Sequence, residues 1–188
     1  MKTICVTCAV LAAALGCGAK WMTIDDFSDN ARGWIYGGDV KNGAAYQPIR
    51  IGPGAGRESV AILEWKDVPG NNVDYAELFL SLPKPVDLTR VKATRFTVWQ
   101  DHPGVVYYHY FYDGTNGVWS DTRYVKTGRW ETVTIPMMLT AKESEFNREV
   151  CREIKICVRN IAEGGPLGEG TAYIDDFEMD IAPAGEER

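Results

Sequence analysis

The stretch Gly170–Asp180, which reads GTAYIDDFEMD, decides the fold of this 188-residue chain. Its central tetrapeptide, Ile174–Phe177 (IDDF), occurs a second time near the start of the chain as Ile24–Phe27. Each copy alternates apolar and polar residues, a pattern typical of a half-buried β-strand. Each copy also places two adjacent carboxylates among apolar residues, where an unpaired charge is costly to bury. We therefore expect the first and last strands of one β domain to lie near each other, with their aspartates neutralised there.

The sequence between the two copies favours strands over helices. The chain has the length of a single domain, and its 19 glycines, 9 prolines and 11% aromatic residues supply both turns and strand-forming residues. Short alternating runs recur without a long helical pattern between them. We predict an all-β fold, a β-sandwich of jelly-roll type with about nine or ten antiparallel strands. The domain covers residues 20–181, and residues 182–188 form a frayed tail.

The first 19 residues have the order of an export signal. A lone positive charge at Lys2 precedes the apolar run Ile4–Leu15 and the small residues Gly16–Ala19. The apolar run is too short for a membrane-spanning helix. We expect export to the cell surface or to the extracellular or periplasmic space. The sequence Ala-Leu-Gly before Cys17 resembles a lipoprotein cleavage box, so lipidation of Cys17 and plain secretion with cleavage after Ala19 both stay open.

Charge and cysteine spacing narrow the classes of partner and of site. The net charge of −6 opposes nucleic acid and anionic membranes as partners, since both select basic surfaces. If residues 152–158 form one strand, the six-residue separation of Cys151 and Cys157 spans about 20 Å, which exceeds the reach of a disulfide unless the chain turns just after Cys151. We expect two buried cysteines without a bridge. The part after the signal has no Cys/His zinc pattern.

The run Val105–Tyr112, which reads VVYYHYFY, is the most aromatic segment. In a strand, one side carries His109 with two aromatic neighbours and the other side carries three tyrosines. Only one side can face the core, so the other is expected to line a groove. Tyrosine and tryptophan also fill cores, and only the collection of such residues indicates a sugar-binding groove, in which rings stack on sugars and polar groups bind hydroxyls. The candidate aromatic residues are Trp99, Tyr108, Tyr110, Tyr112 and Trp119, and the candidate polar residues are Glu77, Asp101, His102 and Arg123.

Four segments together match a known pattern. They are the two IDDF copies with Trp34 after the first, the run GRWETVTIP at residues 128–136, and IKICV at residues 154–158. Their order resembles the galactose-binding-like jelly roll of carbohydrate-binding modules, notably family 11 and relatives in families 4, 22 and 30. The same frame occurs in the complex I intermediate-associated protein 30 family, and a shared fold does not establish a shared function.

The resemblance implies a sugar-binding groove on one sheet and a structural calcium ion near the terminal strands. Asp25, Asp26, Asp175 and Asp176 are the candidate calcium ligands. By strict alternation, Asp175 shares a face with Tyr173, Phe177 and Met179, so a cation would offset the cost of burying its charge. In the alternative, the aspartates reach solvent or pair with Arg and Lys side chains. If calcium binds, a chelator lowers the melting temperature.

Non-catalytic binding of a polysaccharide or oligosaccharide is the first functional hypothesis, with a partner enzyme or capture at the cell surface as its context. The second is a small lyase or hydrolase that uses the same groove, with His109 among the tyrosines and Arg123 on the neighbouring strand. The third is a structural or protein-interaction domain at the cell surface. No Gly-x-Ser-x-Gly, His-Glu-x-x-His or P-loop motif is present, which removes the commonest motif-bearing enzymes, so no catalytic residue is assigned. The sequence names neither the glycan nor the part of it that is bound.

Overall fold

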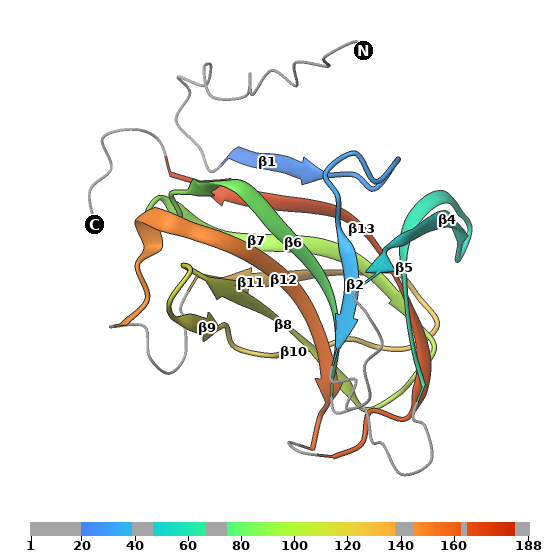
Figure 1. Ribbon diagram of the computed structural model, residues 1–188. Coiled ribbons are helices and arrows are strands. Elements are labelled where there is room, and N and C mark those ends of the chain that lie inside the picture. The colour runs from blue at the N-terminus through green and yellow to red at the C-terminus, as the bar shows by residue number, and fades with distance from the viewer. Residues whose placement is uncertain (1–19, 39–46, 67–74, 138–144, 163–164, 183–188) are drawn as a thin grey trace.

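Two antiparallel sheets stacked face to face make up the structure, which is a computed structural model (Figure 1). It describes residues 20–38, 47–66, 75–137, 145–162 and 165–182. The first sheet, sheet A, has the order β11 (Glu131–Pro136), β7 (Val91–Gln100), β13 (Glu169–Ile181), β5 (Arg57–Lys66) and β4 (Arg50–Gly54), and β1 (Lys20–Asp25) also pairs with β13. The second, sheet B, has the order β10 (Arg123–Tyr124), β8 (Val105–Tyr112), β12 (Cys151–Asn160), β6 (Tyr75–Val86), β2 (Ile35–Gly38) and β3 (Gln47–Pro48), with β9 (Gly117–Trp119) on β8.

The all-β sandwich agrees with the prediction. The described residues form thirteen strands rather than nine or ten, because the short strands β3, β9 and β10 at the margins of sheet B have only two or three residues each. A short 3₁₀ turn, Arg148–Val150, precedes β12. No helix in the described part of the chain combines the length and apolar character needed to span a membrane. Cys151 and Cys157 are both buried free thiols, in agreement with their spacing.

The two IDDF copies meet as expected. β1 pairs with the end of β13, and Asp25 lies opposite Phe177 in the register. The phenylalanines of both copies pack on one tryptophan: the ring centroids of Phe27 and Phe177 lie 5.6 and 5.8 Å from that of Trp34. All three side chains are fully buried. The repeated tetrapeptide therefore closes the core from both ends of the chain.

A bulge in β13 corrects one detail of the prediction. Strict alternation placed Asp175 on the same face as Phe177 and Met179. The pairing with β7 shifts register between Asp175 and Glu178, and Asp176 adopts a left-handed conformation with φ of 52°. The extra residue reverses the parity of the strand, so that Phe177 joins Ile174 in the core while Asp175 faces Arg57 instead.

Candidate functional site

The outer face of sheet B, the side turned away from sheet A, carries aromatic residues in rows that cross the strands. Residues opposite each other in an antiparallel pair point to the same side, so the register defines the rows. The row that we call the ring row consists of Trp119, Tyr110, Lys155, Phe79 and Ile35. The next row, the recessed row, consists of Tyr108, Cys157, Glu77 and Gly37. Two flanking rows lie outside these: one consists of Tyr124, Val106, Arg159 and Tyr75, and the other of Gly117, Tyr112, Glu153 and Ser81.

Exposure differs between these rows. In the recessed row, Cys157 and Glu77 are each only 2% exposed, although they point away from the core. Trp119 in the ring row is 42% exposed, and Tyr124 in the flanking row is 52% exposed. The buried side chains of Cys157 and Glu77 therefore lie between two rows with more exposed aromatic side chains. All of these rows run across β8, β12 and β6.

An ion pair lies at the centre of this face. The Nζ atom of Lys155 is 3.0 Å from Oε1 of Glu77, and the same ammonium group lies 4.9 Å from the ring centroid of Phe79 and 5.1 Å from that of Tyr110. The lysine therefore neutralises a buried carboxylate and holds two rings by cation–π contacts.

The thiol and phenol beside Glu77 are protonated groups. Burial and the nearby Glu77 carboxylate raise the pKa of the Cys157 thiol, and burial raises the pKa of the Tyr108 phenol. The Sγ atom of Cys157 lies 3.8 Å from Oε2 of Glu77. At neutral pH this row offers neutral hydrogen-bonding groups rather than an activated nucleophile.

A glycine fixes the position of one ring. A Cβ atom at Gly117 would overlap the hydroxyl of Tyr110, so the absence of a side chain on β9 leaves the space that the phenol occupies. Gly117 ends the turn Asp113–Gly117, which the sequence identifies as a hairpin turn without showing what its glycine accommodates.

The structure brings five of the nine predicted sugar-site residues together. Glu77, Tyr108, Tyr110, Tyr112 and Trp119 share the outer face of sheet B. Sequence reasoning missed several residues of the same face. They alternate with core residues just as the predicted ones do, but the register that makes them neighbours is not visible in the sequence. These residues are Lys155, Phe79, Cys157, Tyr75 and Tyr124.

The prediction was wrong in placing Trp99 in the same groove. Trp99 belongs to β7 of sheet A, where its ring packs on Tyr173 with a centroid distance of 5.4 Å. Arg123 is also displaced, because it pairs with the core-facing Tyr107 at the edge of sheet B and donates a hydrogen bond to its neighbour Thr122. The order of strands in the sheets causes the first error and the register of β10 on β8 causes the second, and the sequence shows neither.

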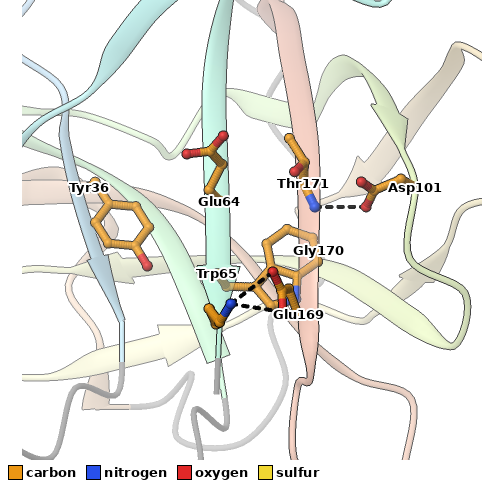
Figure 2. Close-up of a pocket in the computed structure, with 8 residues that line it drawn as sticks. Tyr36, Glu64, Trp65, Asp101, Glu169, Gly170 and Thr171 are labelled. Carbon is orange, nitrogen blue, oxygen red and sulfur yellow. Dashed lines mark hydrogen bonds and ion pairs between the residues drawn. The ribbon is translucent and has the colours of Figure 1, made fainter. Parts of the chain in front are cut away.

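Asp101 and His102 lie at the end of β7 and belong to a different region. Oδ1 of Asp101 accepts a hydrogen bond from the backbone N–H of Thr171 at 2.7 Å, as Figure 2 shows. His102 packs beside Gly170, and its ring lies 6.4 Å from that of Trp65. Both residues therefore face the first residues of β13 rather than the tyrosines of β8.

His109, the base considered for an enzyme, lies in the core. Its side chain is fully buried among the rings of Phe96, Phe111 and Phe177, and its Nδ1 atom is 3.1 Å from the backbone oxygen of Lys155. Burial lowers the pKa of this imidazole to about 4, so it is neutral at pH 7. A ligand on the outer face of sheet B does not reach it.

All four candidate calcium ligands have protein groups as partners. The guanidinium of Arg57 contacts both Asp175 and Asp176, at 2.9 Å from Oδ2 of the latter, and stacks 4.1 Å from the ring of Trp130. Asp25 accepts hydrogen bonds at 2.9 Å from Nε1 of Trp34 and from the backbone N–H of Phe27.

Burial raises the pKa values of both Asp25 and Asp175, because desolvation disfavours the charged form of each carboxyl group. The exposed Asp26 accepts a hydrogen bond from the backbone N–H of Ser28 at 3.0 Å. In the described residues, no three Asp, Glu, His or Cys side chains are grouped as for a metal ion. Protein groups thus already engage the four aspartates, and a calcium ion at this place stays a prediction.

Comparison with known proteins places the fold among carbohydrate-binding modules. The family 11 module of a cellulosomal cellulase of Clostridium thermocellum superposes with a TM-score of 0.62 at 13% identity, over 90% of this chain and 99% of that one. A family 11 module from Clostridium thermocellum in complex with a β-1,3-1,4-mixed-linked tetrasaccharide gives 0.60 at 12% identity, over 88% and 98%. A family 28 module specific for non-crystalline cellulose gives 0.58 at 15% identity, over 84% and 94%. No protein-family model and no curated protein sequence matches the chain. The chain thus has the β-sandwich fold of these modules.

Proposed function

We propose that the protein is a non-catalytic module that binds a neutral polysaccharide on the outer face of sheet B. The observation that carries this proposal is the set of rows in which aromatic side chains of β6, β8 and β9 surround the buried Glu77–Lys155 pair. The fold supports it, because similar modules include one in complex with a tetrasaccharide and one specific for non-crystalline cellulose.

Ring spacing on this face suits a chain of sugar units. Tyr108, Tyr110 and Tyr112 follow one another at every second residue of β8, so their attachment points are about 7 Å apart along the strand, while adjacent rows of backbone are about 4.8 Å apart across the strands. Aromatic rings contact the C–H faces of sugars, and phenol groups bind their hydroxyls. A glycan laid on this face meets several rings at once, and each adds a modest contact.

The charges of the face favour a neutral glycan. Two carboxylates, Glu77 on β6 and Glu153 on β12, are balanced in number by two cations of β12, Lys155 and Arg159. Lys155 lies between two rings and is paired with Glu77, so its charge is compensated within the protein. An anionic glycan would meet no excess of positive charge here.

Binding is favoured over catalysis by the state of the acid–base groups. His109 is buried on the opposite side of β8, and Glu77 is held in its ion pair. A hydrolase needs two carboxylic groups placed on either side of a glycosidic bond, one of them free to donate a proton. The contacts of Glu77 serve to fix the rings instead.

Export of the protein would determine where this binding takes place. The order of residues 1–19, which lie outside the described residues, supports placing the module at the cell surface or outside the cell. A lipid on Cys17 would hold it at the membrane, whereas cleavage after Ala19 would release it. In either case, the module would bring a glycan to the surface or to a partner enzyme.

Affinity electrophoresis tests the proposal with a matched pair of variants. The full chain is run through gels that contain β-1,3-1,4-glucan, non-crystalline cellulose, or other plant, algal and host glycans. We expect retention in at least one gel, with about a tenfold loss of affinity in Tyr110→Ala, or about 1.4 kcal/mol. Trp99→Ala removes a ring from sheet A and should leave retention unchanged. Lack of retention on every glycan, or an equal loss in both variants, would contradict the proposal.

A further inference from the structure

A second concave region lies between the two sheets at the edge formed by β2 and β5. Its walls come from Tyr36 on β2, from residues 64–66 on β5, and from Asp101 and residues 169–171. The pocket has a volume of about 790 Å³, within the range of small-molecule sites. Tyr36 lies opposite Leu78 in the register and therefore points to the inner side of sheet B. This pocket is thus distinct from the outer face of sheet B.

An indole N–H without a partner lies in the wall of this pocket. Trp65 is only 3% exposed, and its Nε1 atom has no hydrogen-bond partner in the described part of the chain. A Cβ atom at Gly170 would lie 2.6 Å from Cζ2 of this indole and 2.9 Å from Cε2, the ring carbon bonded to the nitrogen. Figure 2 shows the ring beside Gly170 and Glu169, between β5 and β13. Because Gly170 has no side chain, the indole packs directly against its backbone, and the Nε1 atom stays buried without an acceptor in the described residues. A buried N–H is stabilised when it gains an acceptor.

The rim of the pocket consists of carboxylates that have acceptor capacity left. Oε1 of Glu169 lies 3.2 Å from Nζ of Lys66, and Oδ1 of Asp101 accepts the N–H of Thr171. Each carboxylate accepts more hydrogen bonds than these, since its two oxygens provide about four acceptor positions. Burial raises the pKa of the Tyr36 phenol, and the charge of Glu64 adds to this shift, so the hydroxyl is protonated and can donate as well as accept.

The chemistry of the pocket selects a neutral, hydroxylated ligand. Three carboxylates and one lysine line it, which disfavours phosphate or a uronic acid. An aromatic wall with acceptors on the rim and an N–H donor in the wall matches a single sugar unit, whose hydroxyls both donate and accept. We propose that this pocket binds one neutral sugar residue, such as the end of a glycan chain, independently of the outer face of sheet B.

Titration of the Trp65 indole resonance tests this inference. The full chain has six tryptophans, so its ¹H–¹⁵N spectrum has six indole signals, and Trp65→Phe assigns the relevant one. The probes are glucose, galactose, mannose and a β-1,3-1,4-linked tetrasaccharide. We expect the Trp65 signal to shift in a saturable way with at least one probe. The double variant Asp101→Asn/Glu169→Gln should weaken this response at least tenfold, while Glu58→Gln, on the exposed side of β5, should not.

Three outcomes would overturn the proposal. They are a Trp65 signal that moves with no neutral sugar, a response that is equal in the double variant and in Glu58→Gln, and a response to a small amine cation in place of sugars. Tyr110→Ala separates this inference from the proposed function. Loss of polysaccharide retention with an intact Trp65 titration supports two independent sites, whereas a Trp65 titration in a protein retained by no polysaccharide supports the pocket and contradicts only the proposed function.

Discussion

The outer faces of the two sheets use the same residue types differently. On sheet A, Trp130 stacks on Arg57, Trp21 stacks on Arg95, and Tyr173 lies over Gly54. These rings are fixed by groups of the protein itself. On sheet B, the rings surround one ion pair, and the two aromatic side chains that are largely exposed in the described residues, Trp119 and Tyr124, both belong to this sheet. The number of aromatic residues on a face therefore says less about binding than what already covers their rings.

Replacing the cation on each outer face tests whether that cation stabilises the fold, supports glycan binding, or does both. In Lys155→Met, the carboxylate of Glu77 loses its counter-ion while 2% exposed, so we expect a loss of about 3 kcal/mol in the free energy of unfolding. Because Phe79 and Tyr110 also lose their cation–π partner, glycan retention should fall as well. Urea unfolding and affinity electrophoresis measure the two effects. Unchanged retention in a folded Lys155→Met protein would place the glycan elsewhere.

Arg57→Met should destabilise the protein by about 2 kcal/mol and leave retention intact. It removes the partner of Asp175 and Asp176, but the Arg57 side chain is 32% exposed, so solvent screens part of the interaction. Arg50→Met is the matched control, since it breaks an exposed pair with Glu64 and should cost less than about 0.5 kcal/mol.

Melting curves with calcium and with chelator belong to the same experiment. If Arg57 is the cation that neutralises these carboxylates, both additions leave the melting temperature of the unmodified protein unchanged. A chelator that lowers the melting temperature would instead support the calcium prediction.

Acid should lower stability by an amount similar to that of Arg57→Met, and this effect comes from the core between the two faces. The pKa of His109 is lowered from 6.5 to about 4, so its contribution to stability is complete above pH 6.5 and is lost as pH falls toward 4. Between pH 7 and pH 5 this amounts to about 2 kcal/mol, since each pH unit below 6.5 costs about 1.4 kcal/mol.

The carboxylates Asp25 and Asp175 oppose this loss. Their raised pKa values give stability that is present below 3.8 and is lost as pH rises through their folded pKa values, so they gain as pH falls. Urea unfolding at several pH values should show a flatter profile in His109→Gln than in the unmodified protein. Parallel profiles would mean that the imidazole titrates normally in the folded state.

Local patterns in the sequence predicted the local structure well. The alternation of Val105–Tyr112 correctly separated the core side from the tyrosine side, and the two IDDF copies correctly indicated that the terminal strands meet. The same rule failed at Asp175, because one left-handed residue, Asp176, shifts the parity of the rest of the strand. Alternation describes a regular strand and contains no signal for a bulge.

Contacts between residues on neighbouring strands could not be predicted from the sequence. Glu77 was predicted as a site residue, but its partner Lys155 is 78 residues away and becomes a neighbour only through the β6–β12 register. Trp99 and the pocket around Trp65 depend likewise on which strands adjoin β13. Strand order in a sandwich is set by packing of the whole core. The sequence therefore identified individual site residues more reliably than it showed which of them share one face.

The central position of β13 in sheet A has a consequence for the timing of folding. Among the described strands β13 comes last in the sequence, yet it lies between β7 and β5 and also pairs with β1 (Figure 1). Sheet A and the packing of Phe177 on Trp34 thus wait until residues up to about 181 have been synthesised. A ribosome-bound chain that lacks β13 leaves one edge of β5 and one edge of β7 unpaired, so it depends on protection from aggregation until the last strand arrives.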